Sequence, residues 1–191
     1  GGLYSLQDLE YMEYWTKNAK RGVIVGGGLI GIEMAEMLLS RHIDVSFLVR
    51  ESSYWNNVIP PEESEMVNRH IREHHVDLRL GTELAEIIDD GNGKVKAVKT
   101  SKGEIIECEW VGLTAGVKPN VHFLKGSDIQ IGRGVLINEY FETNVPNVYA
   151  IGDCAEFRHH LPLRKSIEQV WYTGKMHGET VALTITGKRR A

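Results

Sequence analysis

The stretch of sequence that decides the fold is Gly22-Val-Ile-Val-Gly26-Gly27-Gly28-Leu29-Ile30-Gly31. It joins a β-branched run, typical of a buried parallel strand, to glycines spaced as G-x-G-x-x-G. In this spacing the first glycine permits a tight turn, the second lets the main chain approach a pyrophosphate, and the third lets a helix press against the sheet. Free N–H groups at the helix start then face the anion, aided by the helix dipole. We expect a dinucleotide to contact all six residues of the turn: Gly26, Gly27, Gly28, Leu29, Ile30 and Gly31.

The flanking segments supply the context that this turn needs. A helix that is apolar on most faces is predicted over 28–40, and a second strand over 44–49. Strand, glycine turn, helix and strand in this order form a βαβ unit. A bare G-x-G-x-x-G is weak evidence because glycine turns are common, but here the context favours dinucleotide binding over a purely structural turn.

The rest of the chain predicts a mixed α/β architecture. Ser5 and Asp8 resemble a capping box in a lead-in helix. The other expected elements are a helix from Pro60 to His75, a strand over 76–80, strand-like stretches over 84–88, 94–100 and 104–113, short strands over 135–137 and 148–151, and a final helix over 166–185. Hairpin signals join the three strand-like stretches, which predicts a three-stranded antiparallel β-meander that leads into a further parallel strand.

Composition narrows the function classes. The 191 residues are 42% hydrophobic and carry a formal net charge of −4, with no basic stripe, so we expect no nucleic-acid partner. The apolar stretches are too short to span a bilayer, so we expect no membrane association and a cytoplasmic location. Cys108 and Cys154 are far apart in the sequence, which argues against a disulfide framework or a zinc site. We expect both to be packing residues.

The choice between NAD and NADP should be determined at the end of the second predicted strand. An acid there accepts hydrogen bonds from the ribose hydroxyls of NAD, whereas an arginine pairs with the extra phosphate of NADP. This chain offers both, as Arg50 and Glu51. Arg50 lies closer to the position expected for the acid, which favours NADP slightly; the alternative is that Arg50 is only a solvated surface charge.

Two further segments carry a family resemblance. Thr114-Ala-Gly-Val-Lys-Pro-Asn120 and Thr143-Asn-Val-Pro-Asn-Val-Tyr-Ala-Ile-Gly-Asp-Cys-Ala155 resemble two signatures of the flavin-dependent pyridine nucleotide-disulfide oxidoreductases. The second is the more specific, since T-x(5)-Y-A-I-G-D rarely arises by chance. Together with the glycine turn the resemblance covers nearly the whole chain. Within that family the sequence is most similar to the NAD(P)H-dependent reductases and oxidases near nitrite reductase and rubredoxin reductase.

The resemblance implies a Rossmann-like NAD(P)-binding domain inserted into an FAD-binding domain. On this basis residues 1–20 are a lead-in helix or linker, 21–141 the NAD(P)-binding domain, and 142–191 a returning segment of the FAD-binding domain. The cofactors implied are NAD(P)H and, in the full-length protein, FAD.

The family also implies roles for single residues. Asp153 matches the acid that hydrogen-bonds the flavin ribityl chain, the alternative being a turn aspartate. Ala115 and Gly116 match backbone that approaches the nicotinamide half of the cofactor. Glu33 matches an acid near the nicotinamide, or equally a solvated helix charge. No catalytic acid or base is expected, because the cofactors carry the chemistry.

The sequence departs from the family pattern in ways that predict a fragment. No second G-x-G-x-x-G precedes residue 20, the C-terminal interface domain that often supplies dimer contacts is absent, and the chain begins with Gly1 rather than methionine. Lys118 also stands where arginine is usual, which keeps the charge but loses the bidentate fork. We therefore expect poor FAD binding and no turnover by this piece alone, and a homodimer of the full-length protein stays open.

The function expected of the intact enzyme is hydride transfer from NAD(P)H to FAD and onward to an unidentified electron acceptor. The rival hypothesis is a stand-alone dinucleotide-binding regulatory module without turnover, and a methyltransferase is disfavoured because its fold lacks the meander and the Asp153 signature. The histidine pairs 74–75 and 159–160 lack a third ligand and are expected to be surface residues. Tyr54 and Trp55 could cover an adenine or simply pack.

Overall fold

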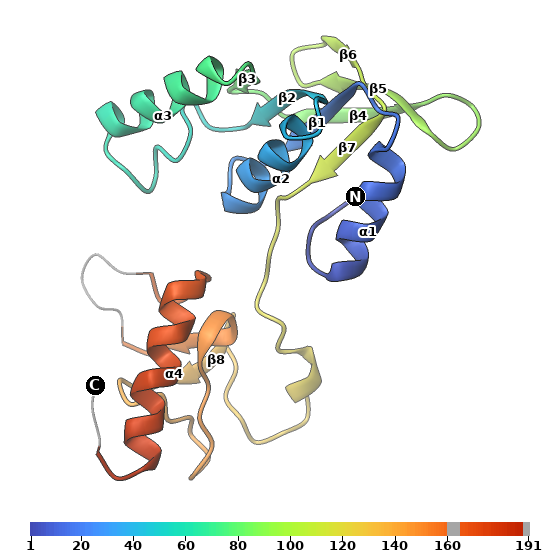
Figure 1. Cartoon of the computed structure of the whole chain (residues 1–191). Helices are drawn as coiled ribbons and strands as arrows, with labels where there is room; N and C mark the ends of the chain where they lie inside the picture. Colours follow the sequence, from blue (N-terminus) through green and yellow to red (C-terminus); the bar gives the residue numbers. More distant parts are fainter. Residues whose placement is uncertain (160–164, 189–191) are drawn as a thin grey trace. The chain divides into compact units, whose positions relative to one another are not determined.

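The computed structural model describes residues 1–159 and 165–188. Contacts divide the chain into two compact units, Gly1–Gly116 and Val117–Ala191 (Figure 1). This division falls earlier than the boundary at residues 141–142 expected from the family resemblance. Contacts alone do not say which cofactor each part would hold, so the assignment of cofactor domains stays a prediction.

A four-stranded parallel sheet forms the centre of the first unit. Its strands are β1 (Arg21–Val25), β2 (Asp44–Val49), β3 (Asp77–Leu80) and β7 (Trp110–Leu113). They lie in the order β3-β2-β1-β7, and every neighbouring pair is parallel. All four strands therefore end at one edge, and the glycine turn follows β1 at that edge.

Three helices pack on one face of this sheet: α1 (Leu6–Thr16), α2 (Leu29–Leu39) and α3 (Pro61–Glu73). Ile24 and Phe47, from the two central strands, are fully buried in the core on this face. The side chains of successive strand residues alternate between faces, and the neighbouring Val23 and Leu48 join a second core on the opposite face. Both faces are thus covered, which explains why β1 and β2 are apolar almost throughout.

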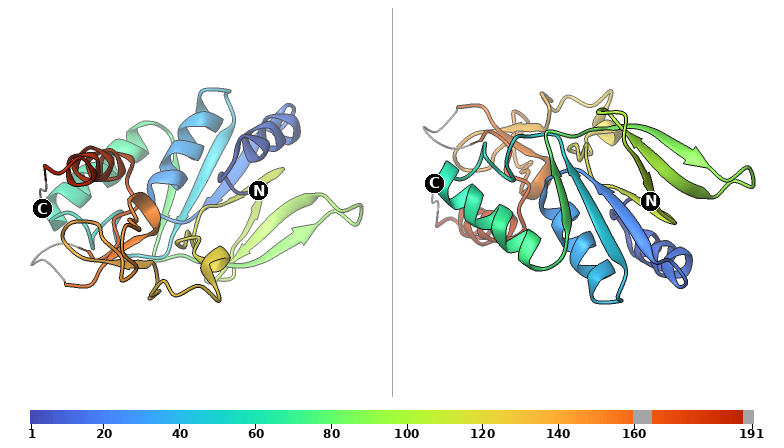
Figure 2. Two further views of the ribbon diagram at one scale, coloured as in Figure 1. Left: turned by 90° about the horizontal axis from the view of Figure 1, so that it is seen from below. Right: turned by 90° about the horizontal axis from the view of Figure 1, so that it is seen from above.

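The second core lies beneath a three-stranded antiparallel sheet. Its strands are β4 (Leu84–Asp89), β5 (Val95–Thr100) and β6 (Ile105–Glu107), in that order. Val98 and Ile106 from this sheet pack with Cys108 and Val111, and β4 and β5 project away from α2 and α3 (Figure 2). The predicted meander is confirmed, although the stretch 104–113 divides into β6 and the parallel strand β7.

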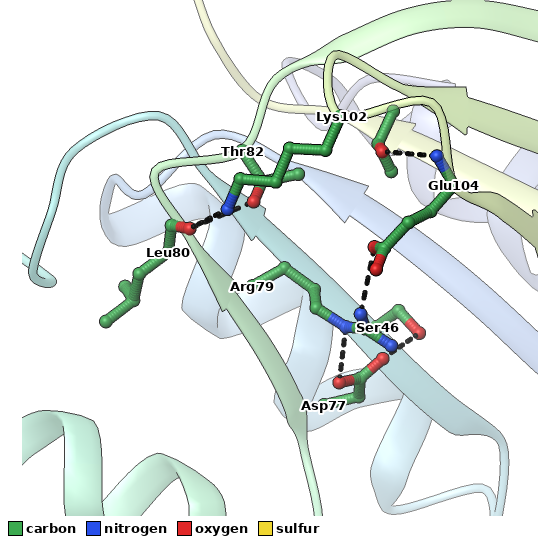
Figure 3. Close-up of polar contacts among 8 residues, drawn as sticks. Ser46, Asp77, Arg79, Leu80, Thr82, Lys102 and Glu104 are labelled. Carbon is green, nitrogen blue, oxygen red and sulfur yellow. Dashed lines mark hydrogen bonds and ion pairs between the residues drawn. The ribbon is translucent and has the colours of Figure 1, made fainter.

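A group of polar contacts ties the antiparallel sheet to the parallel sheet (Figure 3). Arg79 on β3 donates to Asp77 at 2.7 Å and to Glu104, just before β6, at 3.0 Å. Ser46 on β2 donates to the other oxygen of Asp77 at 3.0 Å. Nearby, Lys102 donates to the carbonyl oxygen of Leu80 at 3.1 Å. One guanidinium therefore links β3 to the turn that leads into β6.

The second unit is richer in loops. Its elements are η1 (His122–Leu124), β8 (Val135–Ile137), η2 (Gly152–Cys154), β9 (Ala155–Phe157) and α4 (Trp171–Ile185). Strands β8 and β9 pair in parallel. The buried core of the unit consists of Ile137, Phe141, Ala155 and Val181.

Two predictions for this unit are wrong in part. Residues 148–151 do not form a strand, although Tyr149 makes an isolated bridge with Glu142. The strand that pairs with β8 is β9, which the sequence did not indicate. The final helix begins at Trp171 rather than at Ser166. The predicted strand over 135–137 is confirmed.

The first unit matches its predictions more closely. The capping box of Ser5 and Asp8 is present at the start of α1. Strand β2 has the predicted bounds, and α2 and α3 each lie within one or two residues of theirs. Among the helices of the described residues, none has the length and apolar character needed to cross a bilayer.

The contacts of Arg79 give a prediction about stability. Arg79→Met keeps the aliphatic stem and removes both ion pairs, so it should lower the free energy of unfolding by about 1 kcal/mol or less, because the pairs are partly exposed. The loss should shrink at high salt, since ions screen such pairs. Urea unfolding at two salt concentrations measures both effects.

Arg72→Met is the matched control. The guanidinium of Arg72 is 4.0 Å from the Glu65 carboxylate and is half exposed, so we expect little change. Equal losses for the two variants would show that the Arg79 contacts do not hold the sheets together.

Candidate functional site

The glycine turn occupies the edge at which the parallel strands end. β1 ends at Val25, and the N–H of Gly26 still donates to Leu48 on β2 at 3.0 Å. Gly26 then adopts a φ of +119°, a conformation that L side chains rarely adopt. A Cβ at Gly31 would overlap the carbonyl oxygen of Gly26 and lie 3.1 Å from the Phe47 ring. These two glycines therefore let the chain reverse and let α2 approach β1 closely.

Gly28 differs from its neighbours because a Cβ there would meet nothing within 4 Å. At Gly27 it would lie 2.8 Å from Val49. Gly28 is the N-cap of α2 and has extended backbone angles that any residue can adopt. Neither packing nor conformation within the protein requires glycine at position 28, and this is what a backbone reserved for the approach of a ligand would show.

The backbone N–H groups on either side of this open position have no partner among the described residues. In the described part of the chain, the N–H groups of Gly27, Gly28 and Leu29 donate to no protein acceptor. The first turn of α2 also carries no acidic residue. Unpaired donors and the positive end of a helix dipole are what a diphosphate requires. The residues present therefore fit the pyrophosphate of a dinucleotide.

The segment after β7 lies beside the glycine turn. The hydroxyl of Thr114 donates to the carbonyl oxygens of Val25 and Gly26, at 3.0 and 3.2 Å. The backbone N of Ala115 lies 3.1 Å from the position that a Gly26 Cβ would take. Ala115 and Gly116 are exposed. The structure thus brings together the turn and the two residues expected on the nicotinamide side. Thr114, which the sequence analysis did not single out, holds the two segments together through its hydroxyl.

Arg50 and Glu51 follow β2 at the same edge of the sheet. Their side chains form an ion pair at 2.9 Å, and the Arg50 side chain is 72% exposed. Glu33, the acid expected near the nicotinamide, is also exposed, on α2. Arg50 and Glu33 are thus open to solvent and Glu51 is partly buried, and whether each one contacts a cofactor stays a prediction.

Tyr54 is buried. From the sequence it was expected either to cover an adenine or to pack in the core. It is 3% exposed and packs against Phe47 with ring centroids 6.0 Å apart. Its hydroxyl donates to the carbonyl oxygen of Gly28 at 3.2 Å. Burial, followed by the charges of Glu33 and Glu36, raises the pKa of Tyr54 to about 12. The ring is therefore part of the core, and its hydroxyl contacts the glycine turn.

Asp153 lies in the second unit, exposed on η2. The N–H of the preceding Gly152 donates to Nδ1 of His177 on α4 at 3.2 Å, which ties this short segment to the helix. The expected role of Asp153 toward the flavin stays a prediction.

The two cysteines differ in burial, and His74, His75 and His159 are exposed. Cys108 is 2% exposed, and burial, with a smaller contribution from Glu109, raises the pKa of its thiol to about 11, so it is an inert core residue. Cys154 is only half-buried. Within residues 1–159 and 165–188 no three His, Cys, Asp or Glu side chains gather as metal ligands. His160 lies outside the described residues.

The family assignment now rests on more than motifs. The family model described as pyridine nucleotide-disulphide oxidoreductase matches residues 2–178. The chain belongs to this family. Its members are NAD(P)H-dependent flavoproteins, which agrees with the cofactors expected from the sequence.

Individual relatives agree with this assignment. The NAD(P)H coenzyme A polysulfide/persulfide reductase of Pyrococcus horikoshii is 35% identical over 94% of this chain and 39% of its own length. The nitrite reductase (NAD(P)H) of Bacillus subtilis is 28% identical over 80% of this chain and 19% of its own length. A solved putidaredoxin reductase, in covalent complex with putidaredoxin, is 27% identical with a TM-score of 0.88, covering 100% of this chain and 46% of that one. The chain thus spans less than half the length of each.

The contrast between two glycines of the turn predicts two different effects on stability. Gly31→Ala should lower the free energy of unfolding by about 1–3 kcal/mol, because the added methyl group overlaps backbone that cannot move aside. Gly28→Ala should cost less than about 1 kcal/mol, since the position is open and extended. Urea unfolding of both variants measures the difference. A large loss at position 28 would mean that this glycine serves packing rather than ligand approach.

Proposed function

We propose that residues 26–31 bind the pyrophosphate of NAD(P)H, and that the chain is the NAD(P)H-binding portion of a flavin-dependent oxidoreductase. The observation that carries the proposal is the open space at Gly28 beside unpaired N–H donors. Family membership supports the same cofactor. The alternative of a regulatory module has no such support, because the relatives are oxidoreductases.

The residues at the sheet edge suggest how the cofactor would lie. We place the adenosine end near Arg50 and Glu51 after β2, and the nicotinamide end near Ala115 and Gly116 after β7. These strands flank β1 on opposite sides, so a dinucleotide lying across the turn would extend toward both. Glu33 is proposed on the nicotinamide side.

When bound, NAD(P)H supplies a hydride from C4 of its nicotinamide ring. In this proposal the protein binds and orients the cofactor and supplies no acid or base. Asp153 is proposed to hydrogen-bond the ribityl chain of FAD, with residues 21–141 serving NAD(P)H and 142–191 serving FAD. The electron acceptor is unidentified.

We further propose that this chain alone binds NAD(P)H without catalysing reduction of an acceptor. The G-x-G-x-x-G turn that would hold the pyrophosphate of a dinucleotide occurs once in the sequence, at residues 26–31. One such turn serves one dinucleotide, so the chain has no second cradle of this kind for FAD.

Calorimetric titration with NADH and with NADPH tests the binding site. We expect a dissociation constant in the roughly micromolar to millimolar range, as for nicotinamide enzymes generally. Gly28→Val should abolish binding because its side chain blocks the approach of the pyrophosphate, while the free energy of unfolding stays within about 1 kcal/mol of the unchanged chain. Absence of heat with either cofactor, or undiminished affinity in Gly28→Val, would contradict the proposal.

A second titration tests cofactor preference. Arg50→Ala should weaken NADPH binding by roughly three- to tenfold and leave NADH binding nearly unchanged, because only NADPH carries the extra phosphate that an arginine pairs with. Glu51→Gln is the matched control and should not weaken NADPH. Equal effects of Arg50→Ala on both cofactors would identify Arg50 as a general surface charge.

A further inference from the structure

Two buried polar side chains of α3 hold the main chain of Tyr54 from both sides. The N–H of Tyr54 donates to Oδ1 of Asn68 at 3.0 Å. The hydroxyl of Ser64 donates to the carbonyl oxygen of Tyr54 at 2.5 Å. Ser64 and Asn68 are both fully buried. The backbone position of Tyr54 is thus set by the helix.

These contacts close into a ring through Ser53. The Asn68 side-chain amide donates to the Ser53 hydroxyl at 2.7 Å, and the Ser53 and Ser64 hydroxyls are in hydrogen-bond contact. Donation therefore runs from Asn68 to Ser53, then to Ser64, then to the Tyr54 carbonyl, and returns from the Tyr54 N–H to Asn68. The second amide hydrogen of Asn68 donates to Glu65 at 2.9 Å. A fully satisfied buried network of this kind is rigid.

The side chain of Tyr54 links this fixed stretch of backbone to the glycine turn. Its hydroxyl donates to the Gly28 carbonyl oxygen at 3.2 Å. The same oxygen accepts the N–H of Ile32, at 3.3 Å, as the first hydrogen bond of α2. Trp55 stacks on the Tyr54 ring, with centroids 5.5 Å apart and planes 17° apart. The Gly28 carbonyl is therefore held by two donors.

The peptide that joins Gly28 to Leu29 connects this carbonyl to the ligand side. A trans peptide is planar, and its C=O and N–H bonds point in opposite directions. When the carbonyl points into the helix, the Leu29 N–H points out of the helix start, where an anion binds. Fixing one end of the peptide fixes the direction of the other.

We propose that Tyr54 is a positioning residue for the dinucleotide site, whose hydroxyl orients the Gly28–Leu29 peptide so that the Leu29 N–H is already directed at the pyrophosphate. This inference rests on the proposed function of residues 26–31. Pre-orientation improves affinity because the ligand need not order the donor when it binds. The raised pKa of Tyr54 keeps the phenol protonated, and so a donor, through neutral and mildly alkaline pH.

The test is Tyr54→Phe in the full chain, titrated calorimetrically with the cofactor that the unchanged chain binds more tightly. The ring keeps its packing, so the free energy of unfolding should change little, while the dissociation constant should rise by about three- to tenfold, the effect of one lost hydrogen bond. The amide resonance of Leu29 in a 1H–15N spectrum of the free protein should also move, because its peptide loses one of the two donors to the Gly28 carbonyl. A purely structural role would lower the free energy of unfolding and leave the dissociation constant unchanged. Tyr14→Phe, on the 72% exposed Tyr14, is the matched control and should change neither measurement.

Ser64→Ala is a second variant. It leaves the Tyr54 hydroxyl in place but removes the hydrogen bond that holds the backbone carbonyl of Tyr54. It should raise the dissociation constant in the same direction, and its result decides the matter if Tyr54→Phe does not fold. If the unchanged chain binds no dinucleotide, the proposed function fails. If it binds and the variants bind equally well, only the role of Tyr54 is overturned, whether or not the Leu29 resonance moves.

Discussion

The close approach of α2 to the end of β1 is the contact on which the first unit depends. It requires that the Gly31 Cα lie against the Gly26 carbonyl oxygen, a space that no side chain can share. Because the helix starts there, its unpaired N–H groups meet the edge where all four parallel strands end. The same contact that lets the helix pack therefore also places its positive end at that edge. Within this turn Gly31 serves packing, and Gly28 is the glycine proposed to serve binding.

Much of the first unit could be predicted because its signals are local. The β-branched run before Gly26, the capping box of Ser5 and the hairpin turns each depend on residues close together in the sequence. The second unit gave weaker signals. Residues 148–151 are apolar enough to suggest a strand, but the strand in this region is 155–157, which pairs with β8 through tertiary contacts that no local pattern encodes.

Part of the candidate site could likewise be predicted from the sequence, and part could not. The glycine turn and the charges after β2 could be named from spacing alone. The role proposed for Tyr54 could not, because its hydroxyl donates to Gly28, which is distant in the sequence. One signal was present: Ser64 and Asn68 lie on the same face of α3 as the buried Ile71, and polar residues on a buried face require partners. The sequence does not reveal which partners they have.

The route of the chain from β3 to β7 has a consequence for how this fold can vary. These strands lie at opposite edges of the parallel sheet, and residues 81–109, including the whole antiparallel sheet, connect them. The entropy of closing such a connection grows only with the logarithm of its length, by about 0.6 kcal/mol for each doubling. Lengthening or trimming the β4–β5 hairpin would thus alter the cost of joining the two edges very little. Changes in the length of this hairpin, as distinct from changes in the residues that it buries, are therefore thermodynamically cheap.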